Sequence, residues 1–179
     1  MIIGRGSTSF NLIRDLAVRL PVVALPPWLD QGSYPIAIDD VVYAIVRSLD
    51  VVLTESTCND LPGPEWITHR QLLARVSALL GTRIIERRLA SVTTGIASRI
   101  LGLISREPYS VVAELVAGLP SDLNPHGKSL WTLIGKVPTR PIMSAILDAL
   151  ADETSPIEPS SATQERLVKR IREVELNSI

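Results

Sequence analysis

The hydrophobic pattern changes its period at one point of the chain, close to residue 38. Ile36 and Ile38 alternate with Ala37 behind Pro35, which is typical of a short strand. Apolar residues then recur at helical spacing along one face: Val41, Val42, Ile45, Val46 and Leu49. Asp39 suits the N-cap of this helix, and Asp40 adds a carboxylate to the first turn. The pattern therefore predicts a strand that runs directly into a helix over residues 34–49.

Shorter elements are predicted before this strand–helix unit. Residues 1–4 are apolar and β-branched, and they predict a very short strand that ends at Gly4. A helix is expected next, with one apolar face: Phe10, Ile13, Leu16, Ala17 and Leu20. It should end near Pro21, with a short strand over 21–24 and a Pro-rich loop over 25–32.

The segment after the unit predicts further α/β structure. Residues 51–57 are rich in Val and Thr and favour a strand, and residues 59–64 favour a turn. Thr68 and Gln71 have the spacing of a capping box at the start of a helix. The buried stripe expected for that helix is Leu72, Leu73, Val76, Leu79 and Leu80, and Gly81 suits the position after its end. Residues 83–89 favour one more strand.

The pattern becomes mainly helical from residue 90 onward. Helices are expected over 91–104, 109–119 and 141–152. A Pro-, Ser- and Thr-rich linker over 154–161 precedes a last helix, which extends to about residue 177. We therefore divide the chain into an α/β part (1–89), a mainly helical cap region (90–153), and a linker with a C-terminal helix (154–179).

Composition narrows the function classes. Apolar residues make up 46% of the 179 residues and aromatic residues only 4%, so the core must be aliphatic. The net charge of −1 and the lack of a basic stripe argue against nucleic-acid binding. No apolar run is long enough to span a bilayer, and the N-terminus lacks a secretory signal pattern. The single Cys58 favours a reducing compartment and is expected to be a buried, inert thiol, so we expect a cytoplasmic protein.

Few residues suggest a catalytic, cofactor-binding or metal-binding role. Residues 4–9, Gly-Arg-Gly-Ser-Thr-Ser, follow a strand and open a helix, as a dinucleotide fingerprint does, with Asp30 at a tolerable distance. Ser9 stands where the third glycine belongs and would crowd the helix–strand packing, which favours a simple structural turn. His69 is expected at an exposed first-turn position and His126 in a loop, and neither has the neighbours of a zinc ligand or a nucleophile pair.

Three segments together resemble the C-terminal half of a short-chain dehydrogenase/reductase. They are Gly4-Arg5-Gly6, the Tyr34–Val42 segment YPIAIDDVV, and the Gly63–Leu73 segment GPEWITHRQLL. The closest branch is the extended and atypical one, which includes NAD(P)-dependent epimerase-like and NmrA-like proteins. The resemblance covers about residues 1–152. It implies a partial Rossmann-type parallel sheet with a helical cap, a cofactor of the parent family that is NAD or NADP, and a position for Gly4, Arg5 and Gly6 near the nicotinamide end and the substrate.

The sequence also departs from that family. The glycine-rich cofactor turn of its N-terminal half is absent, and so is the Tyr-x-x-x-Lys catalytic pair. Four residues after Tyr34, Tyr43 and Tyr109 stand Ile38, Arg47 and Ala113.

We therefore expect a truncated or split substrate-side half, with further structure before the first strand and without activity of its own. A binding or structural module that pairs with a partner is the second interpretation, and a complete enzyme with another mechanism is the third. Either of the first two would expose a sheet edge, so we expect self-association or a partner chain that completes the sheet.

Overall fold

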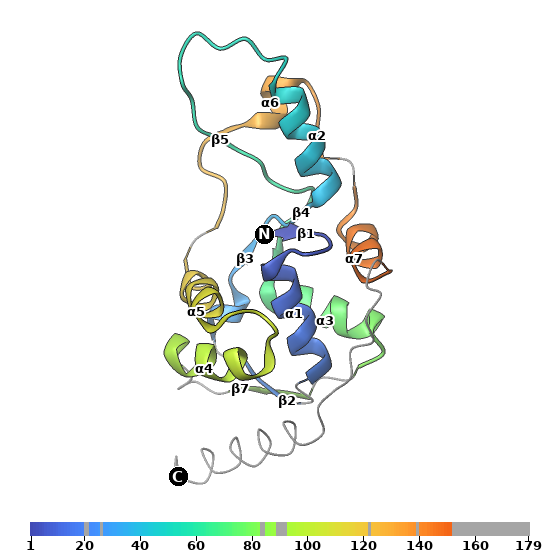
Figure 1. The fold of residues 1–179 in the computed structure, drawn as a ribbon, viewed down its shortest axis with the longest axis vertical. Helices are drawn as coiled ribbons and strands as arrows, with labels where there is room; N and C mark the ends of the chain where they lie inside the picture. The colour runs from blue at the N-terminus through green and yellow to red at the C-terminus, as the bar shows by residue number, and fades with distance from the viewer. Residues whose placement is uncertain are drawn as a thin grey trace.

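The computed structural model describes residues 1–19, 22–25, 27–82, 85–88, 93–121, 123–138 and 140–151 (Figure 1). The helices are α1 (Thr8–Arg19), α2 (Ile38–Ser48), α3 (His69–Leu79), α4 (Thr94–Ile104), α5 (Tyr109–Gly118), α6 (Leu130–Ile134) and α7 (Ile142–Ala151), with a 3-10 turn η1 (Pro27–Asp30). The strands are β1 (Ile2–Ile3), β2 (Val22–Leu25), β3 (Gly32–Ser33), β4 (Ile36–Ala37), β5 (Asn59–Asp60), β6 (Ile67–Thr68), β7 (Ile85–Arg88) and β8 (Lys128–Ser129). The predicted linker and helix of 154–179 lie outside the described residues.

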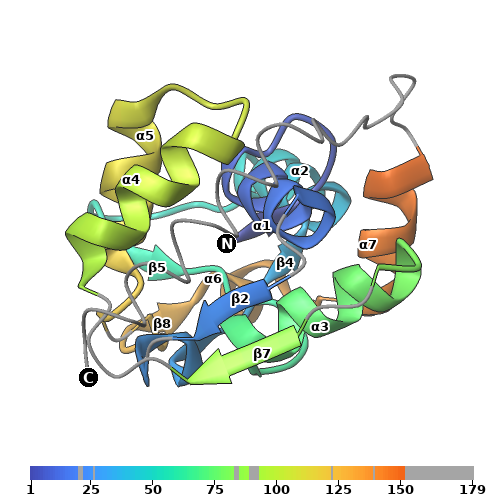
Figure 2. The same ribbon diagram turned by 90° about the horizontal axis from the view of Figure 1, so that it is seen from below.

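The strands form short pairs, and most of the pairs are parallel. β1 pairs with β4, β2 with β7 and β5 with β8 in parallel, whereas β3 and β6 are antiparallel. Figure 2 shows β2 and β7 side by side, pointing the same way. The fold is α/β, with parallel strands joined through helices, consistent with a partial Rossmann-like architecture.

Most of the hydrophobic core lies in what we call the α1–α3 body, made of α1, α3, α4, α5 and α7. Its fully buried side chains include Phe10 of α1, Leu72 and Val76 of α3, and Ile146 of α7. The predicted stripe of α3 is confirmed, since Leu79 and Leu80 also pack against this core. The Thr68–Gln71 capping box and the positive φ of Gly81 (67°) are confirmed as well.

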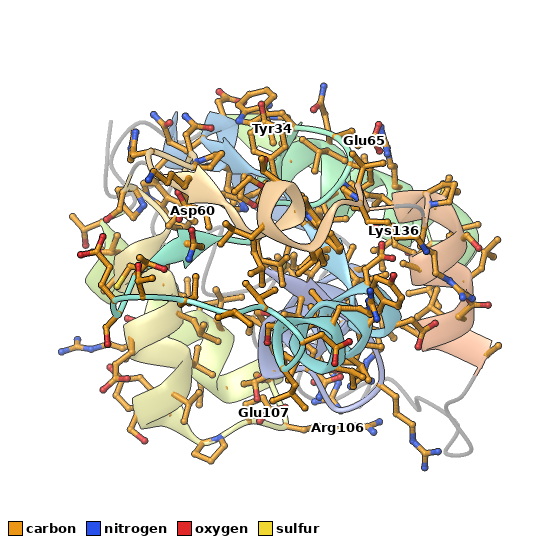
Figure 3. The ribbon with its side chains drawn as sticks, turned by 90° about the horizontal axis from the view of Figure 1, so that it is seen from above. Tyr34, Asp60, Glu65, Arg106, Glu107 and Lys136 are labelled. Carbon is orange, nitrogen blue, oxygen red and sulfur yellow. The ribbon has the colours of Figure 1, made fainter. Side chains whose placement is uncertain are left out.

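α1 also buries an ion pair that its apolar pattern does not reveal. Arg14 and Asp15 are 4% and 0% exposed, and Arg14 Nη2 lies 2.9 Å from Asp15 Oδ1. The second oxygen of Asp15 accepts the Arg106 amide at 3.0 Å. Arg106 and Glu107 lie on the turn between α4 and α5 (Figure 3), so Asp15 holds that turn against α1.

The remaining helices form the smaller α2–α6 lobe, made of α2, α6, β5 and β8, at the top of Figure 1. Its buried hydrophobic cluster joins Ala44 of α2 and Trp131 of α6 to Ile36 of the adjoining β4. The Trp131 indole donates to the Pro62 carbonyl at 2.7 Å. Asp60 accepts the amide of Gly127 at 2.6 Å, which locks β5 to the segment before β8.

A close backbone contact joins the lobe to β4 at Gly63. The Gly63 amide donates to the Tyr34 carbonyl at 3.1 Å. A Cβ atom on Gly63 would lie 1.6 Å from the Pro35 carbonyl oxygen. Only a residue without a side chain fits between these two segments.

Two predictions about the segment after α2 are wrong. Residues 51–57 form a loop and not a strand, because the amides of Asp50 and Val51 bond to Arg47 and Ser48 and so complete the end of α2. Strand pairing begins later, at Asn59, inside the segment predicted as a turn. α6 and β8 were not predicted at all, since five residues of helix carry too little periodicity.

Candidate functional site

The Gly4–Arg5–Gly6 turn connects β1 to α1. Gly4 is buried, and a Cβ there would lie 2.5 Å from Cγ2 of Ile38, so the turn passes directly beneath the start of α2. Gly6 has a φ of 77°, and the Ser7 amide donates to the Gly4 carbonyl at 3.2 Å. Arg5 and Gly6 are exposed. The glycines therefore allow a tight turn that presents the Arg5 side chain to solvent.

This turn lies at the carboxyl end of a parallel strand pair. Ile3 of β1 is in register with Ala37 of β4, and both strands continue into helices. In open α/β sheets, ligands bind in the crevice outside the carboxyl ends of such strands. Helix α1 begins at Thr8, so its first amides face the same edge. The geometry therefore resembles a ligand-binding edge, although it holds only two strands.

The other residues of the possible dinucleotide fingerprint do not converge on a ligand. Ser9 Oγ lies 3.3 Å from Ser7 Oγ, and Ser7 donates to the Ile2 carbonyl at 2.7 Å. Asp30 forms an ion pair with Arg70 of α3, with a distance of 2.8 Å. Asp30 is thus engaged elsewhere, which supports the structural interpretation of residues 4–9.

The candidate histidines and cysteine differ from the sequence expectation. His69 is 5% exposed and not a surface residue, because the pairing of β3 with β6 draws its amide onto the Gln31 carbonyl at 3.0 Å. Its Nε2 atom has no hydrogen-bond partner within the described part of the chain. Burial lowers the pKa of His69, and the Met1 amino group adds to the effect. Cys58 was expected to be buried and is exposed, because the loop before β5 lies on the surface.

Asp39 does not cap α2. The helix begins at Ile38, two residues earlier than the capping assignment requires, and the N-cap residue is Ala37, with no side-chain hydrogen bond. Asp39 instead pairs with Arg140 at 2.9 Å, and Asp40 accepts the Arg140 amide at 3.2 Å. The two carboxylates thus tie α2 to the segment before α7, and the capping prediction is wrong.

A small cavity of about 150 Å³ lies at this junction. It is lined by Asp39, Asp40, Tyr43, Lys136, Val137 and Arg140. The Lys136 ammonium lies 4.4 Å from the centre of the Tyr43 ring, a cation–π distance, and Figure 3 shows Lys136 between the lobe and α7. The hydrogen bond that Arg140 donates to the Asp148 carboxylate raises the pKa of Arg140, and the nearby Asp39 and Asp40 charges act in the same direction.

Sequence reasoning missed this cavity because its residues come from segments about a hundred positions apart. Its lining includes neither histidine nor cysteine, and its charges largely neutralise one another. Acidic and basic groups there can bind a small polar molecule, but they do not form a nucleophile with an adjacent base.

Two negative findings apply to the described residues. None of the helices in these ranges is long and apolar enough to cross a membrane. The same part of the chain contains no group of three or more His, Cys, Asp or Glu side chains that could hold a metal ion.

Comparison with known proteins identifies the fold. No protein-family model matches the sequence, and a search of curated proteins finds no relative. Among solved structures, the chain is similar to RMD from Pseudomonas aeruginosa complexed with NADPH, with a TM-score of 0.52 and 14% identity over 84% of this chain and 45% of that one.

A second similar structure is a point mutant of UDP-glucuronic acid 4-epimerase from Bacillus cereus, in complex with NAD and a fluorinated UDP-sugar. The TM-score is again 0.52 with 14% identity, over 83% of this chain and 41% of the epimerase. The chain thus spans less than half of either structure. The likeness shows that the chain shares its α/β fold with part of two proteins whose structures hold NADPH and NAD.

Proposed function

We propose that the chain is the substrate-side, C-terminal half of an NAD(P)-dependent short-chain-dehydrogenase- or epimerase-like protein. In this proposal the phosphate-binding turn and the Tyr-x-x-x-Lys pair are supplied from outside residues 1–179. The chain alone then lacks the groups that transfer a hydride, and its contribution is a wall of the site.

One observation carries the proposal: the Gly4–Arg5–Gly6 turn lies at the carboxyl end of the parallel β1–β4 pair, beneath Ile38. That edge is where α/β folds bind their ligands. The family resemblance assigns the same turn to the nicotinamide end of the cofactor. The fold match to proteins whose structures hold NADPH and NAD supports a cofactor-related role, and coverage of less than half of each of them supports a partial chain.

Titration calorimetry of residues 1–179 with NAD and with NADP tests the first part of this proposal. We expect no useful affinity for either, because the sequence lacks the glycine-rich turn whose backbone amides cradle a pyrophosphate. A dissociation constant in the micromolar range would contradict it and would identify residues 4–9 as a phosphate turn.

The role of the turn is tested in a complex that does bind the cofactor. Arg5→Ala should weaken cofactor or substrate binding while the melting temperature stays unchanged, because the Arg5 side chain is exposed. Arg99→Ala, an exposed arginine of α4, is the matched control and should change neither. Equal binding by both variants would remove Arg5 from the site.

A non-catalytic binding or structural module is the second candidate function. The observation in its favour is the large number of exposed apolar side chains on α2, which suits a protein that works by pairing with another. The reading frame upstream of Met1 separates the two candidates. A glycine-rich turn followed by Tyr-x-x-x-Lys in frame would support the first, and its absence there and in any bound partner would support the second.

A further inference from the structure

Helix α2 carries most of its large apolar side chains on the outside. Ile38, Val42, Ile45, Val46 and Leu49 form what we call the α2 apolar face, and Leu49 is 81% exposed. The side of α2 that packs on α6 is built around the small residue Ala44, which is fully buried, with Val41 and Tyr43 partly buried beside it. A surface helix of a soluble protein normally has the opposite arrangement, with its large apolar residues against the core.

The spacing of this face fits a packed contact. Ile38, Val42, Ile45 and Leu49 follow one another at intervals of four, three and four residues, so they form one straight stripe along the helix. The charged residues of α2, Asp39, Asp40 and Arg47, lie off this stripe. Exposed apolar residues continue past the end of α2 at Val52 and Leu53, which are 93% and 50% exposed. Contiguous patches of this kind mark interaction surfaces.

The α2 apolar face is continuous with the Gly4–Arg5–Gly6 turn. Ile38 begins the face, and its side chain is the one that approaches Gly4. Ile2 of β1, 37% exposed, lies on the strand that leads into the same turn. A body that covers the face at its Ile38 end therefore also reaches the turn.

We propose that the α2 apolar face is the docking surface for a polypeptide outside residues 1–179 that carries the dinucleotide-binding half of the fold and presents an apolar helix or sheet face. This inference rests on the proposed function. More than half of each similar structure lies outside the part that the chain matches, so the occupant that we propose is the rest of that fold. The parallel β1–β4 pair also requires neighbours, because parallel sheets are covered on both faces. A second copy of this chain would cover apolar surface but would not supply a cofactor turn.

The experiment uses tagged residues 1–179 as bait in a lysate of the source organism. The captured polypeptide is identified, produced in pure form, and mixed with the bait, and binding of NADPH and NAD to the pair is measured. Ile45→Glu places a charge in the middle of the stripe. Leu103→Glu, at a 63% exposed position of α4, is the matched control.

We expect a dinucleotide-binding polypeptide whose affinity falls about tenfold or more with Ile45→Glu and stays unchanged with Leu103→Glu. Circular dichroism checks that both variants fold, and Ile45→Ala replaces Ile45→Glu if the charged variant does not. Capture that survives Ile45→Glu would place the partner on another surface, so the docking inference would fail while the proposed function stands.

The remaining outcomes overturn the inference in other ways. Sedimentation that shows dimers of the bait, lost with Ile45→Glu, would assign the face to a second copy. Capture of no polypeptide, or of one that binds neither NADPH nor NAD, would reject both the docking inference and the split form of the proposed function. Cofactor binding by the bait alone would reject only the proposed function's claim that the cofactor turn lies elsewhere.

Discussion

Helices α3 and α2 have the same length, 11 residues, and both are amphipathic, yet they use their apolar faces in opposite ways. In the α1–α3 body, the stripe of α3 is buried against α1, and Leu72 and Val76 are fully inaccessible. In the α2–α6 lobe, most of the stripe of α2 faces outward, and only Val41 packs against the lobe's core. The difference teaches that a periodic pattern predicts a helix face that needs cover, but does not predict which body provides the cover.

The largest difference in stability between the two regions should come from breaking the buried ion pair in the α1–α3 body. Asp15→Ala leaves the Arg14 guanidinium buried without its carboxylate and releases the Arg106 amide. We expect the free energy of unfolding to fall by on the order of 3–5 kcal/mol. Urea unfolding measures it.

The lobe offers a matched control for that variant. Asp50→Ala breaks the Arg47–Asp50 pair at the end of α2, where both side chains are about half exposed or more. It should cost no more than about 1 kcal/mol, because water screens an exposed pair. Similar losses for the two variants would show that Asp15 is not buried in solution.

The apolar stripes themselves give the second prediction. Leu72→Ala opens a cavity in the α1–α3 body and should cost about 2–5 kcal/mol. Ile45→Ala removes an exposed side chain and should change the stability of the isolated chain by less than about 0.5 kcal/mol. Chemical denaturation of both variants measures the two losses in the free energy of unfolding. A large loss with Ile45→Ala would mean that the α2 apolar face is already covered in the isolated chain.

The two helix starts differ in a smaller but measurable way. Thr68 accepts the Gln71 amide at 3.0 Å, so Thr68→Ala should cost about 1 kcal/mol. Asp39 makes no cap, and its pair with Arg140 is exposed, so Asp39→Ala should cost less than Thr68→Ala. Thermal melts of both variants test the order. An Asp39→Ala loss that Asn restores would revive the capping assignment.

The smallest expected change in the free energy of unfolding appears only when the pH is varied. The pKa of His69 lies below its ordinary value near 6.5 because the imidazole is buried, so the unfolded chain binds a proton more readily than the folded one. The stability from neutral His69 is complete above about pH 6.5 and is lost as the pH falls toward the folded-state pKa.

Urea unfolding at several pH values between about 5 and 7.5 tests this prediction. His69→Gln should flatten the slope, and His126→Gln, at an exposed loop position, serves as the control. A slope that persists in His69→Gln would assign the proton to another group.

The sequence was most informative where local rules decide the structure. The capping box at Thr68, the stripe of α3 and the strand-to-helix turn after β1 each depend on neighbouring residues, and each is confirmed. Val51–Thr57 has strand composition but forms a loop, because a strand also needs a partner, and the described part of the chain offers none there. The capping role of Asp39 failed because Arg140, a hundred residues away, engages the carboxylate instead.

The candidate site was predictable in the same local sense. Glycines after an apolar run identified the turn at residues 4–6, and its glycine-dependent geometry is present. No local pattern predicts the buried Arg14–Asp15 pair, the exposed thiol of Cys58 or the cavity beside Tyr43, since each depends on how distant segments pack. The division into parts at residues 89 and 153 and the cofactor role of the turn stay predictions.

The contact at Gly63 has a consequence for how the gene tolerates variation. Since a methyl group there would overlap the Pro35 carbonyl, the 62–64 segment would have to move away from β4, and β4 leads through Ile38 to the Gly4 turn. In a library of all single substitutions, no replacement of Gly63 should be tolerated, and this includes alanine. Gly6, whose surroundings are open, should still accept asparagine, which tolerates a positive φ. Two glycines that look alike in the sequence would therefore have very different mutational profiles.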